Sequence, residues 1–163
     1  MDADALAVLE YPAIVARLVA ATATPMGADL AAALVPSPDA EEVARRQALT
    51  AEAVGLLDEA DEPELAGAAD VREPVDRAAR DGTLQPAELA AVARTIEAGA
   101  RARSVATPLL GEIAAAIDPG LAGLGGAVAA AVEEDGSDLR DGASPLLRFD
   151  LAVNNLVAWA AGS

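Results

Sequence analysis

The sequence lacks three residue types on which much enzyme chemistry depends. It has no His and no Cys, and all eleven of its basic residues are Arg, so it has no Lys either. Without His there is no Ser-His-Asp triad and no imidazole metal ligand. Without Cys there is no disulfide, thiolate nucleophile or zinc knuckle, and without Lys there is no P-loop lysine or Schiff base. Carboxylates, Arg and hydroxyls remain, so an enzyme built on carboxylates is the least favoured hypothesis.

Aromatic residues and positive charge are also scarce. Aromatic residues make up 2% of the 163 residues, and 27 acidic residues against 11 basic ones give a formal net charge of −16. Such a charge repels nucleic acids and anionic membranes, so we expect no direct nucleic acid binding and no membrane partner. The sequence shows no signal peptide, and its apolar runs stop short of the roughly 20 residues of a membrane span. A cytoplasmic location is expected.

Helix-forming residues are what the sequence has in abundance. Ala, Leu and Val supply most of its hydrophobic residues, and Ala is the best helix former. Caps, prolines and glycines predict where helices begin and end. We therefore expect an all-α fold of seven to nine mostly short helices, over about residues 4–9, 12–21, 25–34, 40–59, 71–80, 86–103, 108–117, 121–132 and 145–159.

Three helix features make specific predictions. Asp39 followed by Glu42 is typical of a reciprocal capping box, in which each side chain binds the other residue's backbone N–H. In the second helix, Ile14 and Leu18 are expected to belong to a single apolar stripe together with the valines at 15 and 19. Arginines on two helices, at positions 45, 46, 94, 101 and 103, are expected to pair with nearby glutamates of the same helices.

Two stretches resemble ligand-binding loops but miss the required spacing. Residues 133–141 are acidic, but their Gly comes too early and no acid stands at the twelfth position of a calcium loop. We interpret them as a solvated acidic turn. The Gly-rich residues 120–126 do not spell a dinucleotide motif, because Val128 stands where the last Gly belongs. Close helix packing or a loose connection is the favoured interpretation.

Short motifs follow one another in a recognisable order over residues 6–147. Leu9-Glu10-Tyr11 opens the series, a T-x-E-A step includes Glu52, and a D-x-R…R-A…G-x-L-x-P-x-E-L pattern runs from Asp70 to Leu89. In this order the motifs resemble the N-terminal segment of the second-type bacterial MutS proteins (MutS-two), paralogues of the mismatch repair ATPase. The resemblance singles out, as structural rather than catalytic positions, Glu10, Tyr11, Glu52, Asp70, Arg72, Gly82, Glu88, Asp135, Gly136, Asp141, Ser144 and Pro145.

The resemblance implies a fold and a function for residues 1–147. These residues would form the N-terminal half of the MutS core, or lever, domain, a non-catalytic scaffold. The full-length family implies ATP and Mg as cofactors, an endonuclease domain, DNA mismatch repair or recombination suppression, and rescue of collided ribosomes. Its clamp, ATPase and nuclease regions have no counterpart here, so no catalytic, metal or cofactor residue is assigned. The expected partners are the remaining MutS-two domains, with a homodimer as a further possibility.

The chain departs from the family at two places. Residues 148–163 are apolar, with no charge after Asp150, where the family continues into a basic lever helix. We hypothesise a truncated or altered chain, whose alternative is a stand-alone helical interaction or dimerisation module. The smaller departure is Gln85, which occupies a position where the family usually has a capping Ser.

Overall fold

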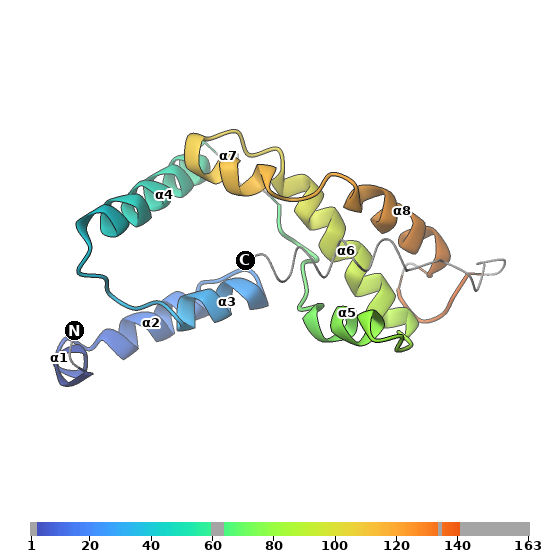
Figure 1. The fold of residues 1–163 in the computed structure, drawn as a ribbon, viewed down its shortest axis with the longest axis horizontal. Helices are drawn as coiled ribbons and strands as arrows, with labels where there is room; N and C mark the ends of the chain where they lie inside the picture. Colours follow the sequence, from blue (N-terminus) through green and yellow to red (C-terminus); the bar gives the residue numbers. More distant parts are fainter. Residues whose placement is uncertain (1–2, 60–63, 134, 141–163) are drawn as a thin grey trace. The chain divides into compact units, whose positions relative to one another are not determined.

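The computed structural model describes residues 3–59, 64–133 and 135–140, and within these ranges the chain forms eight helices and no strand (Figure 1). The all-α prediction is confirmed. The expected helix over 145–159 lies outside the described residues. The helices are α1 (Ala3–Val8), α2 (Tyr11–Ala20), α3 (Pro25–Ala32), α4 (Ala40–Asp58), α5 (Arg72–Ala79), α6 (Pro86–Ala102), α7 (Pro108–Ala115) and α8 (Leu121–Ala131).

Local capping chemistry explains why several helices begin where they do. The Thr24 hydroxyl accepts a hydrogen bond from Gly27 N at 3.1 Å and caps α3. Pro follows the cap in α3, α6 and α7, where its missing N–H costs nothing because the first turn has no intrahelical acceptor. The predicted starts are therefore confirmed at these three helices.

The chain divides into two compact units. The N-terminal unit comprises residues 1–62 and 107–110, and the C-terminal unit comprises residues 63–106 and 111–163. In the N-terminal unit, α2 packs against both α1 and α3. Among its described residues, Ala31 and Leu56 are the buried apolar side chains, each 8% exposed. This unit has helices but little buried core.

The C-terminal unit is organised around α6, the longest helix in it. Val92 and Ile96 pack with Val75 of α5 and Leu121 of α8 in one buried cluster. A second cluster joins α6 to the far end of α8 and consists of Ala90, Ala93, Val128 and Val132. Figure 1 shows α6 and α8 side by side within this unit.

A glycine allows the close approach of these two helices. A Cβ atom on Gly125 of α8 would lie 2.8 Å from Ile96 Cγ2, closer than real side chains come. The interpretation of this Gly-rich stretch as close helix packing is confirmed at Gly125.

The apolar residues predicted on α2 lie on a helix as expected, but only part of the stripe is covered. Val15 and Val19 are half-buried, whereas Ile14 is 59% exposed and Leu18 is 43% exposed. The two pairs lie on different faces because residues 14 and 15 are about 100° apart around a helix.

In the part of the chain that the structure describes, no helix combines the length and hydropathy needed to cross a membrane.

Candidate functional site

The described residues of the family motifs lie at helix ends and turns, except Glu52, which lies within α4. Nine of the twelve are described, and the other three, Asp141, Ser144 and Pro145, lie outside the described residues. Glu10, Tyr11 and Glu52 belong to the N-terminal unit and the other six to the C-terminal unit. Each holds a connection in the chain, so the candidate site is a set of joints between helices.

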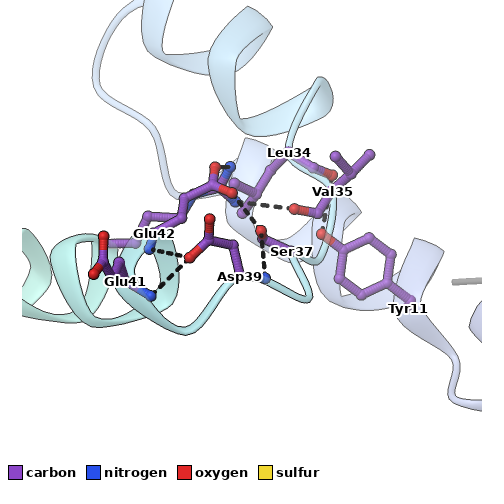
Figure 2. Close-up of polar contacts among 8 residues, drawn as sticks. Tyr11, Leu34, Val35, Ser37, Asp39, Glu41 and Glu42 are labelled. Atoms are coloured by element: carbon purple, nitrogen blue, oxygen red, sulfur yellow. Dashed lines mark hydrogen bonds and ion pairs between the residues drawn. The ribbon is translucent and has the colours of Figure 1, made fainter.

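Glu10 and Tyr11 form the joint at the start of α2. Glu10 has a φ of 54°, and this left-handed residue turns the chain out of α1 and into α2. The Tyr11 hydroxyl donates a hydrogen bond to the carbonyl oxygen of Leu34 at 2.9 Å, 23 residues further along (Figure 2). Tyr11 thereby fixes α2 to the segment that follows α3.

A polar network connects that same segment to α4. The Asp39 carboxylate accepts hydrogen bonds from the N–H groups of Glu41 and Glu42, at 2.8 and 3.2 Å, and caps α4 as predicted (Figure 2). The reciprocal half of the capping box is wrong. The Asp39 N–H donates to the Ser37 hydroxyl at 3.2 Å, and the Glu42 carboxylate binds Ser37 and Arg46 instead.

The charges of this network reinforce it. The hydrogen bond from Ser37, helped by Arg46, holds the pKa of Glu42 below its ordinary value. Arg46 also donates to the carbonyl oxygen of Val35 at 2.9 Å. Local pairing of an α4 arginine is thus confirmed at Arg46. Arg46 also binds the backbone of the segment that precedes α4.

Glu52 forms a long-range joint within the N-terminal unit. Its carboxylate accepts hydrogen bonds from Leu109 N at 3.0 Å and from Leu110 N at 2.9 Å, although these residues lie 57 and 58 positions away. Both N–H groups belong to the first turn of α7, which has no intrahelical acceptors for them. Burial acts to raise the pKa of Glu52, but the hydrogen bonds that its carboxylate accepts, that from the Leu110 N–H foremost, outweigh burial and leave the pKa lowered. Glu52 therefore caps a helix that lies far from it in the sequence.

The start of α5 is fixed by an aspartate-arginine pair. The Asp70 carboxylate accepts from the Arg72 N–H at 3.1 Å, from Nε at 2.8 Å and from Nη2 at 2.5 Å. These hydrogen bonds from Arg72 lower the pKa of Asp70 to about 2. Asp70 thus supplies the acceptor for a first-turn N–H, and its charge is partnered at the same time.

Glu88 connects the end of α5 to the start of α6. Its carboxylate accepts from the Gln85 N–H at 2.7 Å and forms an ion pair with Arg77. The Gln85 N–H is the first cause, and Arg77 the second, of a lowered pKa at Glu88. Arg77 also pairs with Glu73 at 3.2 Å.

Gly82 allows the chain to turn tightly at the end of α5 because it has no side chain. Its N–H donates to the Arg77 carbonyl oxygen at 2.9 Å, and a Cβ at this position would lie 2.6 Å from that oxygen. The left-handed residue of the turn is Asp81, with a φ of 59°. Only a glycine fits at 82, and the reason is contact rather than backbone angle.

Asp135 and Gly136 shape the turn after α8. The Asp135 carboxylate accepts from the Ser137 N–H at 2.9 Å and from its hydroxyl at 2.6 Å, and these bonds lower its pKa. Gly136 has a φ of 71°, and a Cβ there would lie 3.2 Å from the Cα of Ala87. Gly136 therefore lets the turn lie against the start of α6.

Two arginines make contacts that the sequence did not indicate. Arg101 donates to the carbonyl oxygens of Glu64 and Ala66, at 3.1 and 2.7 Å, and Arg103 donates to the carbonyl oxygen of Ile117. The prediction that they pair with glutamates of their own helix is wrong, because backbone carbonyls at chain turns offer them closer acceptors. Arg103 also lines a cavity of about 170 Å³ in the C-terminal unit, which is otherwise mainly apolar.

Most of the motif side chains are engaged in structural contacts. Across residues 3–59, 64–133 and 135–140, no group of three acidic side chains is placed to hold a metal ion. Apart from that of Glu10, the motif carboxylates described above accept hydrogen bonds from backbone N–H groups or arginines. Their arrangement can fix helix geometry, and this is the chemistry that the site supports.

Comparison with known proteins finds relatives that match most of this chain. An endonuclease MutS2 from Symbiobacterium thermophilum is 34% identical over 152 residues, covering 90% of this chain and 19% of that protein. The endonuclease MutS2 of Brevibacillus brevis is 34% identical over 156 residues, or 91% of this chain and 20% of that protein. That of Geobacillus kaustophilus is 36% identical over 112 residues, 69% of this chain and 14% of that protein.

The chain is a MutS2 relative over one segment of those proteins. It spans about a fifth of the length of the first two relatives. No protein-family model and no solved structure matches it. The resemblance of the motif order to MutS-two proteins is confirmed, and the joints at Glu52, Asp70, Gly82 and Glu88 all fall within the range that the motifs span.

Proposed function

We propose that the chain is a non-catalytic helical scaffold segment of a MutS2-like protein. The observation that carries the proposal is the use of the motif residues. All nine described residues end, begin or connect helices, and apart from Glu10 the carboxylates among them accept hydrogen bonds that serve those connections. On this proposal, ATP and Mg binding, DNA contact and nuclease activity belong to regions outside the chain.

The contacts between the helices support a scaffold role. Glu52 ties α4 to the first turn of α7, and Arg77 with Glu88 ties α5 to α6. Charge-assisted hydrogen bonds of this kind are shorter and stronger than neutral ones. Within each unit, helices connected in this way suit the transmission of a change made elsewhere in a larger protein.

A graft into a relative tests this function. The aligned segment of the Symbiobacterium thermophilum MutS2 would be replaced by this chain, and nuclease activity would be measured. We expect the graft to keep the activity, and a graft carrying Gly82→Val to lose it because α5 can no longer close. Gly55→Ala is the matched control, since a Cβ at Gly55 meets nothing within 4 Å. A soluble, helical graft with no activity would contradict the scaffold function.

The isolated chain provides the complementary test. We expect no ATP hydrolysis. We also expect no shift of DNA in a gel at low salt, because the chain carries a charge of −16 and repels DNA. Clear DNA binding or nuclease activity by the chain alone would contradict the proposal.

A stand-alone interaction module is the second candidate function. Large apolar side chains of the N-terminal unit are exposed, for example Leu30 at 76% and Leu57 at 57%, which favours a protein partner. The reading frame next to the gene discriminates the two candidates. A clamp and a P-loop encoded immediately downstream would favour the scaffold, and their absence would favour the module.

A further inference from the structure

Helix α7 is divided between the two units of the chain. Residues 107–110 group with the N-terminal unit, whereas residues 63–106 before them and 111–163 after them form the C-terminal unit. The division falls inside α7, after its first turn. In the described part of the chain, the Glu52 carboxylate supplies the hydrogen bonds that hold residues 107–110 to the rest of the N-terminal unit. This attachment therefore depends on one side chain.

The residue pair Thr-Pro begins both α3 and α7, but the two helix starts are capped differently. In α3, the hydroxyl of Thr24 accepts a hydrogen bond from the N–H of Gly27, three residues further on, at 3.1 Å. The corresponding N–H in α7 is that of Leu110, three residues after Thr107, and it donates to Glu52 at 2.9 Å. The Thr107 hydroxyl oxygen is buried and, within the described residues, accepts no N–H of α7. Helix α7 thus has a local capping residue that is not used as its cap.

The first turn of α7 has two N–H groups that need an acceptor from outside the helix. Pro108 occupies the first helical position and has no N–H. The N–H groups of Leu109 and Leu110 follow, and both donate to Glu52. A carboxylate can accept from both, and its negative charge is favoured at a helix N-terminus. A Thr at the N-cap typically satisfies one of them. Glu52 is therefore the stronger cap, and Thr107 is a weaker alternative.

We propose that the start of α7 is a conformational switch with two alternative caps. In the first state Glu52 binds the first-turn N–H groups and holds residues 107–110 in the N-terminal unit. In the second state the Thr107 hydroxyl accepts from the Leu110 N–H, as Thr24 does in α3. Glu52 is then released, and the whole of α7 belongs to the C-terminal unit.

The switch controls how many times the chain links its two units. In the first state the backbone passes between the units at both ends of residues 107–110 and again after residue 62. In the second state the passage after residue 62 remains alone, so the units move independently. This inference goes beyond the scaffold role and concerns the chain by itself. A failed graft in the relative would leave it standing, and its own failure would leave the graft result unchanged.

Distances between the units test the release. The chain has no Cys, so Ala44→Cys on α4 and Ala130→Cys on α8, both at exposed positions, provide two unique sites for spin labels. Double electron–electron resonance, with excess unlabelled chain to suppress intermolecular distances, gives the distribution of label separations. We expect Glu52→Ala to widen this distribution about twofold or more, because the second state becomes the populated one.

Glu41→Ala is the matched control for this measurement. It removes the same charge from an exposed position of the same helix, and it should leave the distribution as it is in the unmodified chain. Circular dichroism checks that each variant keeps its helices. If Glu52→Ala does not fold, Glu52→Gln, which keeps one acceptor oxygen, should widen the distribution by a smaller amount. A folded Glu52 variant with the narrow distribution of the unmodified chain would overturn the release.

Amide hydrogen exchange at Leu110 tests the second cap. Thr107→Val keeps the shape of the side chain and should not change the exchange rate while Glu52 is present. Glu52→Ala should raise the rate by less than about threefold, because the Thr107 hydroxyl replaces the carboxylate. The double variant should raise it by a further factor of about ten or more. Two results would overturn the second cap: a double variant that exchanges no faster than Glu52→Ala, or faster exchange in Thr107→Val alone.

Discussion

The two units of the chain are built from similar helices but are held together differently. In the C-terminal unit, Val92, Val128 and Val132 are at most 2% exposed. They belong to two buried clusters built mainly from residues of α5, α6 and α8. In the described part of the N-terminal unit, the buried apolar side chains are Ala31 and Leu56. There the connections are polar, through Tyr11, the network around Asp39, and Glu52.

This difference separates two sources of fold stability. Burial of apolar surface provides most of the free energy of folding, whereas a hydrogen bond adds a modest net amount but fixes geometry. The C-terminal unit has both. The N-terminal unit has the fixed geometry with much of its apolar surface still exposed, which is the state expected of a segment that packs on something else.

The difference in packing between the two units should be largest at a buried side chain. Val128→Ala removes two methyl groups from a site that is 0% exposed, and we expect a loss of about 2 kcal/mol in the free energy of unfolding. Val54→Ala makes the same change on α4 at a site that is 48% exposed, and should stay within about 0.5 kcal/mol. Urea denaturation followed by circular dichroism measures both. Equal losses would show that the two units are equally packed.

Glycine substitutions should have opposite signs in the two units. Gly82→Ala places a Cβ 2.6 Å from the Arg77 carbonyl oxygen and should destabilise the chain by about 1–3 kcal/mol. Gly55→Ala adds a methyl group in open space inside α4 and should stabilise it by about 0.5–1 kcal/mol. Thermal unfolding gives the sign directly, and destabilisation by Gly55→Ala would mean that this face of α4 is already covered.

Acid should weaken the Asp70 joint. Because the folded-state pKa of Asp70 is about 2, below its ordinary value of 3.8, this carboxylate stabilises the fold above about pH 4, and the contribution is lost as pH falls towards 2. The side chain is 42% exposed, so solvent screening limits the effect to about 1 kcal/mol. Unfolding of Asp70→Asn should therefore depend less on pH between 4 and 2. Parallel pH profiles for the two chains would refute a native Asp70–Arg72 pair.

The smallest expected effect is at the start of α6. Gln85 has the extended backbone of an N-cap, with φ −78° and ψ 155°, and Ser at such positions caps more strongly than Gln. Gln85→Ser should stabilise the chain by about 0.5–1 kcal/mol. An unchanged melting temperature would mean that the contact between Glu88 and the Gln85 N–H already satisfies this helix start.

Signals between residues close together in the sequence allowed most of the fold to be predicted. Contacts between residues far apart in the sequence could not be predicted. Thr24-Pro25, Asp39 and Pro86 indicate helix starts because caps and prolines act within one turn. The Glu52 cap on α7 could not be predicted, since the N–H groups that it binds are more than fifty residues away. Glu42 was expected to complete a capping box, but Ser37 and Arg46 are competing partners that a four-residue pattern does not include.

The family motifs located the joints without explaining them. Nothing in the letters D-G shows that Gly82 is required by contact with Arg77 while Asp81 adopts the left-handed angle. In the same way, the pattern of α2 gives its apolar residues but not which of its faces is covered. Exposure depends on neighbours that are distant in sequence, and those are visible only in three dimensions.

Native-state hydrogen exchange tests the contrast between the units most directly. Amides of buried α6 and α8 residues, such as Ile96 and Val128, should exchange slowest, with opening free energies near that of global unfolding. Amides of α2 and α3, such as Leu18 and Leu30, should exchange at least about tenfold faster in a sample dilute enough to prevent association. Equal protection in both units would contradict the account, because the N-terminal helices would then be as firmly packed as the C-terminal core.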